Sequence, residues 1–115
     1  MSRPATAADL RAFYGDRPCP TLKGLVVARG EEILGVIGLA REGARSKYFS
    51  EIREDLRPRL RRMISLRTIW KSMELVRSSR LPVYALAQTD EPDSHRVLQR
   101  LGFAHVDGDV YQWPR

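Results

Sequence analysis

The chain has 115 residues, of which 43% are hydrophobic and 30% are charged, and its formal net charge is +6. This length accommodates one domain with a modest core, and the apolar content argues against a disordered chain. No segment approaches the ~20 apolar residues that cross a bilayer, no signal-peptide pattern opens the chain, and the lone Cys19 forms no disulfide framework. We therefore expect a single cytoplasmic domain over residues 1–115.

The first predicted elements are a short edge strand over Arg3 to Thr6 and a capped helix. Thr6 suits the N-cap position, and Asp9 follows three residues later, as in a capping box. The apolar side of this helix consists of Leu10, Phe13 and Tyr14. Gly15 is expected to end it, and the segment after it is rich in Gly and Pro, which is typical of a loop.

An antiparallel hairpin is predicted next, with strands over Leu22 to Ala28 and Ile33 to Ala40. Both strands are rich in branched aliphatic residues, and the turn between them contains Gly30, which can adopt a positive φ. Gly35 and Gly38 are unfavourable inside a strand unless a bulge or a close neighbour requires them. The polar residues 41–47 predict a loop, and Tyr48 to Ile52 predict a further strand.

Between Pro58 and Ser79 the hydrophobic period becomes helical. The predicted buried stripe of this long helix consists of Leu66, Ile69, Trp70, Met73 and Val76. Arginine and lysine side chains occupy much of the other face. We interpret them mainly as a solvated surface, although such a charge also suits phosphate, nucleic-acid or acidic partners.

The segment from Leu81 to Phe103 reads as a strand, a polar loop and a helix. Residues Leu81 to Gln88 are mostly apolar on both faces, as in a central strand, and the alternative from this pattern alone is a buried helix. The helix is expected to begin at Pro92, to present Val97, Leu98 and Leu101 on one face, and to end at Gly102. A final hairpin over residues 104–113 is predicted around the turn Asp107-Gly108.

The order of these elements predicts an α/β domain with a mixed sheet and helices packed on it. Two strands, Tyr48–Ile52 and Leu81–Gln88, would lie parallel and adjacent. The long helix would then connect them as a right-handed crossover.

Two segments resemble the GNAT superfamily of acyl-CoA N-acyltransferases: Arg3-Pro4-Ala5-Thr6 with Asp9, and Arg96 to Phe103 (RVLQRLGF). The resemblance implies a GNAT-like fold, a mostly antiparallel mixed sheet in which a long helix crosses between two central parallel strands. The segments YFSEI and PVYALA also resemble small GNAT-like proteins of tailed bacteriophages. Some phage relatives of that kind are virion components, so phage or virion proteins are implied partners.

The resemblance also assigns expected site residues. Family members bind the acyl-CoA pyrophosphate on a glycine-rich loop before the long helix, where backbone N–H groups reach the phosphates. This chain has arginines there instead, and side-chain binding of acetyl-CoA phosphates would involve Arg57, Arg59, Arg61 and Arg62. Leu98 stands where many family enzymes have a tyrosine acid, so Tyr84, or else Tyr111, is the substitute candidate. Glu51 is the candidate base, the alternative being an ion pair with Arg53 or a helix arginine.

The remaining cysteine and histidine residues are not predicted to be functional. Cys19 has no paired histidine nearby in sequence and is read as a bystander, and His95 and His105 are read as surface or capping residues, with no metal site.

Three functions follow from these patterns. The first is a phage-type GNAT-fold protein that is catalytically impaired and serves as a structural or binding component, in the host cytoplasm or the virion. The second is an active enzyme that transfers an acetyl group from acetyl-CoA to a primary amine. The third, a nucleic-acid-binding module using Arg57 to Arg67, is least favoured because no aromatic residues are interleaved with those arginines.

Overall fold

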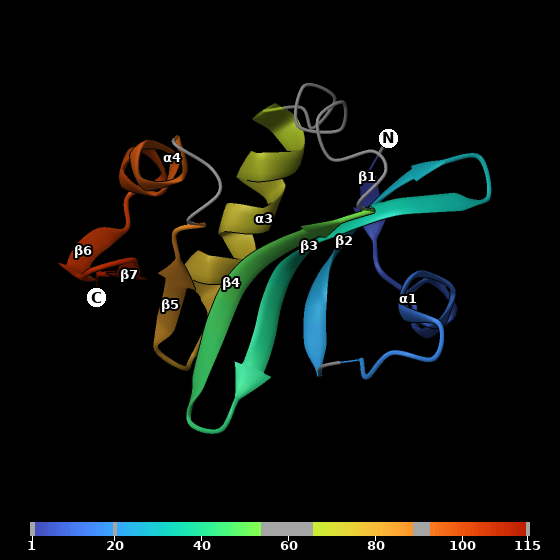
Figure 1. Cartoon of the computed structure of the whole chain (residues 1–115), viewed down its shortest axis with the longest axis horizontal. Helices are drawn as coiled ribbons and strands as arrows, with labels where there is room; N and C mark the ends of the chain where they lie inside the picture. The colour runs from blue at the N-terminus through green and yellow to red at the C-terminus, as the bar shows by residue number, and fades with distance from the viewer. Residues whose placement is uncertain (1, 20, 54–65, 89–92, 115) are drawn as a thin grey trace.

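A computed structural model describes residues 2–19, 21–53, 66–88 and 93–114. The described elements, in chain order, are β1 (Ser2–Pro4), α1 (Ala7–Tyr14), β2 (Leu22–Arg29), β3 (Glu32–Glu42), β4 (Arg45–Ile52), α3 (Leu66–Ser78), β5 (Val83–Leu86), α4 (Ser94–Leu101), β6 (Ala104–Asp107) and β7 (Val110–Gln112). The predicted α/β class is confirmed, since these residues form a mixed seven-stranded sheet with helices packed on it (Figure 1). No helix among the described residues is long and apolar enough to span a membrane.

The sheet has the strand order β1-β2-β3-β4-β5-β7-β6, so the two parallel neighbours β4 and β5 lie near its centre. Every other neighbouring pair is antiparallel. The helix α3 lies between β4 and β5 in sequence, which agrees with the predicted crossover. The sequence order therefore predicted the central pair correctly.

The two faces of the sheet are covered by different helices (Figure 1). On one face, α3 and α4 pack over a core that includes Ile37, Tyr48, Met73, Leu98 and Tyr111. On the other face, α1 packs over β2 and β3 around Val26, Ile33 and Val36. The side chain of Phe49 on β4 also packs against this core.

Local signals located the ends of several elements correctly. The Thr6 side chain accepts a hydrogen bond from the Asp9 N–H at 3.1 Å, and the Asp9 carboxylate accepts one from the Thr6 N–H at 3.0 Å, which completes the predicted capping box. Gly102 ends α4 with φ 107°, and Gly30 has φ 61° in the β2–β3 turn. These conformations favour glycine because a Cβ is strained there.

One predicted loop is wrong. Residues 41–47 were expected to be irregular, but β3 continues to Glu42 and β4 begins at Arg45, so only a tight turn containing Gly43 separates them. The polar composition suggested a loop. Residues 41–45 at this end of the hairpin are exposed, and exposed strand residues can be polar.

The predicted buried stripe of the long helix is wrong for two residues. Leu66 is 74% exposed and Trp70 is 59% exposed, whereas Thr68, Ser72, Met73 and Val76 are buried. The small side chains of Thr68 and Ser72 let α3 approach the sheet, and this rotates the helix relative to the hydrophobic pattern. Residues 58–65 of the predicted helix, residues 89–92 before α4 and the expected start at Pro92 lie outside the described residues.

Candidate functional site

The two parallel strands separate soon after they meet. Their pairing covers only Ser46–Val83, Lys47–Tyr84 and Tyr48–Ala85, although β4 continues to Ile52. The Arg53 N–H donates to the Leu34 carbonyl of β3 at 2.9 Å. Since hydrogen bonding alternates along an antiparallel ladder, the backbone N–H and C=O groups of Ser50 and Ile52 point away from β3, towards the gap left by β5.

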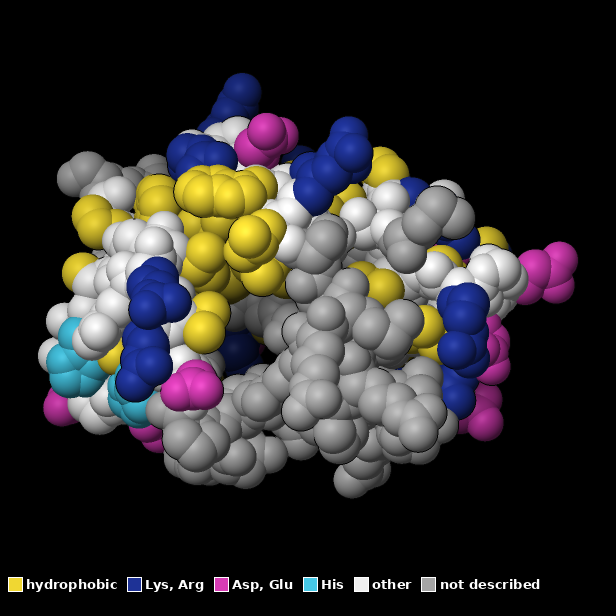
Figure 2. Space-filling model, turned by 90° about the horizontal axis from the view of Figure 1, so that it is seen from above, with side chains coloured by type: hydrophobic (Ala, Val, Ile, Leu, Met, Phe, Trp, Pro, Cys, Tyr) yellow, Lys and Arg dark blue, Asp and Glu magenta, His cyan; other side chains and the backbone are white. Residues whose placement is uncertain are grey.

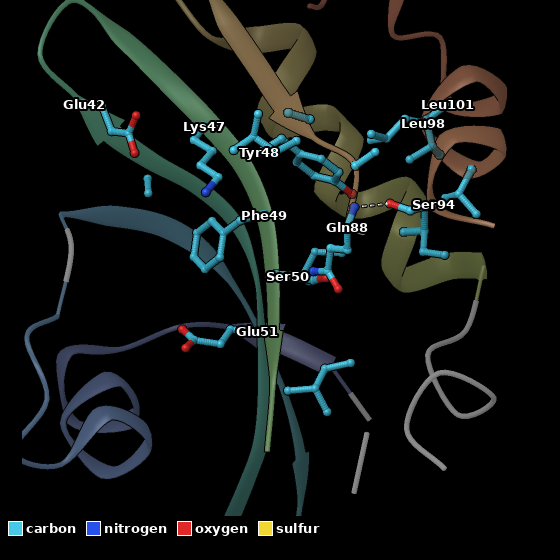
Figure 3. Close-up of a pocket in the computed structure, with 18 of the residues that line it drawn as sticks. Glu42, Lys47, Tyr48, Phe49, Ser50, Glu51, Gln88, Ser94, Leu98 and Leu101 are labelled. Carbon is cyan, nitrogen blue, oxygen red and sulfur yellow. Dashed lines mark hydrogen bonds between the residues drawn. The ribbon is translucent and has the colours of Figure 1, made fainter. Parts of the chain in front are cut away.

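The gap opens into a cleft with a volume of about 1260 Å³. Its described lining comes from β4 between Lys47 and Ile52, the end of β5, the inner side of α4, and Tyr14 and Arg17 beside α1. Figure 3 shows Glu42, Lys47, Phe49 and Glu51 on one side of β4, and Tyr48, Ser94, Leu98 and Leu101 on the other. Among the described residues nothing pairs with this part of the β4 edge, and a cleft of this size with such an edge in its wall can hold an extended polar ligand.

Glu51 lies on the α1 side of the cleft. Its carboxylate forms an ion pair with the Arg17 guanidinium at 3.2 Å, and its side chain is 39% exposed. The observed partner is not the predicted Arg53, which pairs with Glu32 at 3.3 Å, and the arginines at the start of the predicted helix lie outside the described residues. Arg17 is far from Glu51 in sequence, and the turn after α1 brings the two together.

Tyr14 completes this corner of the cleft. Its ring lies 5.2 Å from the Arg17 guanidinium carbon, and its hydroxyl is buried with no hydrogen-bond partner in the described structure. Burial, and secondly the nearby Glu51 carboxylate, raise the pKa of Tyr14 well above its usual range. Tyr14 therefore stays protonated, with its buried O–H close to the Glu51 carboxylate. The sequence reading used Tyr14 only as an apolar helix residue.

Tyr84, the candidate acid, lies elsewhere. Its hydroxyl donates to the Glu42 carboxylate, and its ring lies 4.2 Å from the Arg45 guanidinium carbon. Burial, and secondly Glu42, raise its pKa. Tyr84 is not among the described residues that line the cleft, so the structure does not bring it together with Glu51.

The helix α4 has no acid at the position of Leu98, as expected, but it carries another hydroxyl group, that of Ser94. Leu98 lines the cleft and is buried, where it contributes no proton. One turn earlier, the Ser94 Oγ accepts a hydrogen bond from the Gln88 N–H at 2.9 Å, as Figure 3 shows. Because that bond uses an oxygen lone pair, the Ser94 O–H remains able to donate into the cleft. The sequence reading did not single out Ser94.

Tyr48 lies where β4 and β5 separate, but its hydroxyl proton is engaged in a hydrogen bond. Its hydroxyl lies 2.7 Å from the Ser72 Oγ, and Ser72 donates its own proton to the Ile69 carbonyl at 2.7 Å. Tyr48 must therefore be the donor to Ser72, and burial raises its pKa. It forms part of the cleft wall and links β4 to α3.

The remaining candidates lie away from the cleft. His95 bonds Tyr111 at 2.8 Å and Asp109 at 3.1 Å, which ties α4 to the β6–β7 hairpin and also occupies the Tyr111 hydroxyl. His105 bonds the Gly108 carbonyl at 2.8 Å. Within the described ranges no group of three or more His, Cys, Asp or Glu residues could hold a metal ion. Arg57, Arg59, Arg61 and Arg62 lie outside the described residues, so their phosphate-binding role stays a prediction.

Comparison of the chain with protein-family models, with curated proteins and with solved structures found no significant match. The function is therefore inferred from the cleft and the residues around it.

Proposed function

We propose that the protein is a divergent GNAT-type N-acyltransferase that transfers an acyl group from acyl-CoA to a primary amine. The observation that carries this proposal is the early end of the β4–β5 pairing at Tyr48 and Ala85, which leaves a strand edge and a cleft where two parallel neighbours would otherwise continue. The amide groups of a pantetheine arm suit such an edge, since they can pair with the backbone groups of Ser50 and Ile52 as a strand would.

Acyl transfer needs a group that accepts a proton from the amine and a group that stabilises the leaving sulfur, and residues around the cleft suit both roles. Acyl-CoA would supply the acyl group as a thioester, so the reaction forms a C–N bond and breaks a C–S bond. Glu51 accepts the proton that the attacking amine loses, directly or through a water molecule. The Arg17 guanidinium beside it disfavours a second positive charge, which helps to keep the amine neutral. The Ser94 O–H donates a hydrogen bond to the sulfur that becomes negative.

The test is the rate of thiol release from acetyl-CoA in the presence of a panel of primary amines. Glu51→Gln is expected to lower kcat about 100-fold or more, as loss of a general base does. Glu42→Gln is the matched control, because Glu42 also lines the cleft but bonds Tyr84 on β5. Its effect on kcat is expected to be under threefold. No thiol release with any amine, or equal losses in both variants, would contradict the proposed chemistry.

A second candidate function is a binding component without turnover, of the phage structural type. The ion pair that occupies Glu51 and the buried Leu98 at the usual acid position favour it. Calorimetry with coenzyme A separates the two functions. Binding together with turnover supports the enzyme, and binding without turnover supports the component.

A further inference from the structure

One exposed stripe of α3 combines an aromatic ring with cationic side chains. Arg67, Trp70, Lys71 and Arg77 recur at spacings that place them on one side of a helix, and all four are exposed. The Arg77 guanidinium carbon lies 5.9 Å from the centre of the Trp70 ring. We call these four residues the α3 platform. Leu66, at 74% exposed, lies at its N-terminal end.

The α3 platform carries three cationic side chains, and the exposed Glu74 lies on the same side of the helix, three residues from Lys71 and from Arg77. Glu74 is the only acidic residue of α3, and within the described part of the chain none of the three platform cations forms an ion pair. Figure 2 shows hydrophobic side chains gathered on one part of the surface, with Lys and Arg side chains and an acidic side chain beside them. With one carboxylate against three cations, this side of α3 keeps a net positive charge, and the whole chain carries a net charge of +6, which suits an anionic partner.

From these observations we propose that the α3 platform binds single-stranded nucleic acid, an activity separate from acyl transfer in the cleft. Trp70 offers its ring to stack on a base, as aromatic residues do in sequence-tolerant sites. The cations of Arg67, Lys71 and Arg77 contact the phosphates on either side of that base. From Arg67 to Arg77 the helix rises about 15 Å, enough for a short run of nucleotides.

The arrangement fits nucleic acid better than a lipid surface. A helix that lies in a membrane interface presents a broad apolar face. The apolar face of α3, formed by Met73 and Val76, is turned into the core, and the exposed apolar side chains of α3 are Leu66 and Trp70, bordered by charges. A cation beside an exposed indole resembles the combination of stacking and cation–π contact used by single-strand binders.

The test is fluorescence anisotropy of a labelled 12-nucleotide oligothymidylate titrated with the full chain at 50 mM salt. Trp70→Ala is expected to weaken binding at least fivefold, since one base–aromatic stack contributes about 1–3 kcal/mol. The double substitution Lys71→Gln with Arg77→Gln is expected to reduce the slope of log K against log salt by about 1.4, since each phosphate contact on a single strand contributes about 0.7.

Arg11→Gln is the control for general charge, because Arg11 is an exposed residue of α1 on the opposite face of the sheet. It is expected to change the affinity less than twofold. Unchanged melting temperatures verify that the variants are folded. The proposal is overturned if the oligonucleotide does not bind, if Trp70→Ala binds as the wild type does, or if phosphatidylserine vesicles bind at the platform while the oligonucleotide does not.

Discussion

Gly38 shows how one residue sets the geometry of the sheet. It pairs with Gly24 across the β2–β3 ladder, and a Cβ added at Gly38 would lie 2.1 Å from the Lys23 carbonyl oxygen and 2.6 Å from the Gly24 Cα. Both contacts are with backbone atoms, which cannot move aside as a flexible side chain can. The glycines of this strand were predicted to need a bulge or a close neighbour. Gly24 is the close neighbour of Gly38, and the register shift between Val27 and Ala28 places a bulge next to Gly35.

Gly38→Ala is therefore expected to lower the free energy of unfolding by about 3 kcal/mol or more, at or above the upper end of overpacking effects. Urea denaturation followed by circular dichroism measures it. Gly30→Ala is the comparison, because Gly30 has φ 61° but open space around an added Cβ. Only the conformational strain of about 1 kcal/mol is expected there. A smaller loss at Gly38 than at Gly30 would show that the two strands can separate without much strain.

At the scale of elements, α1 is fixed at its N-terminus by one carboxylate. Asp9 accepts hydrogen bonds from the Arg3 guanidinium, at 2.8 Å for one of them, and from the Thr6 N–H. The Arg3 side chain first, and the Thr6 N–H second, hold the pKa of Asp9 well below its usual range. Asp9 thus links the edge strand β1 to α1, and α1 in turn positions Tyr14 and Arg17 beside the cleft.

This pKa shift predicts how stability depends on pH. A depressed pKa in the folded state means that the carboxylate stabilises the protein above the ordinary Asp value of about 4 and loses that effect as the pH falls through the folded value. Asp9→Asn should therefore lower the melting temperature clearly at pH 7, and the difference from the wild type should shrink towards pH 2. Asp16→Asn, a change at an exposed residue with no ion pair or hydrogen bond to other described residues, is the control and should leave the melting temperature at pH 7 close to that of the wild type. A difference at Asp9 that grows as the pH falls would contradict this.

The helices and their caps also show what the sequence can predict. The capping box of Thr6 and Asp9 and the end of α4 at Gly102 depend on neighbours within a few residues, so their patterns were sufficient. The exposure of Trp70 was missed because the rotation of α3 depends on how closely Thr68 and Ser72 approach strands elsewhere in the chain. The mixed sheet could be predicted from the order of the elements. The early separation of β4 and β5 could not, because no residue pattern in either strand indicates it.

The same limit applies to the site. Glu51 was found because its strand precedes the long helix, and the structure does place it at the cleft. Its partner Arg17 and the buried hydroxyl of Tyr14 were missed, since only the fold brings α1 beside β4. Ser94 was missed because a serine that begins a helix resembles an ordinary surface residue until the Gln88 N–H is seen to orient it.

At the scale of the whole molecule, the two proposed activities belong to different surfaces. The cleft lies between β4, β5, α4 and the end of α1, and the α3 platform faces solvent on the side of the sheet that carries α3 and α4. The central claim is that the gap between the diverging strands is a binding site for the pantetheine arm of acyl-CoA. It depends on the free edge of β4 and not on turnover, so it can be tested even if the amine acceptor is unknown.

The most direct test is an NMR titration of the labelled protein with acetyl-CoA. We predict saturable shifts that are largest for the backbone amides of Ser50, Ile52 and Ser94, with little change along the exposed strand β6. Amide shifts report the pairing of backbone groups on the free edge, so they do not depend on catalysis. An unchanged spectrum at millimolar acetyl-CoA, or shifts confined to the α3 platform, would contradict the central claim.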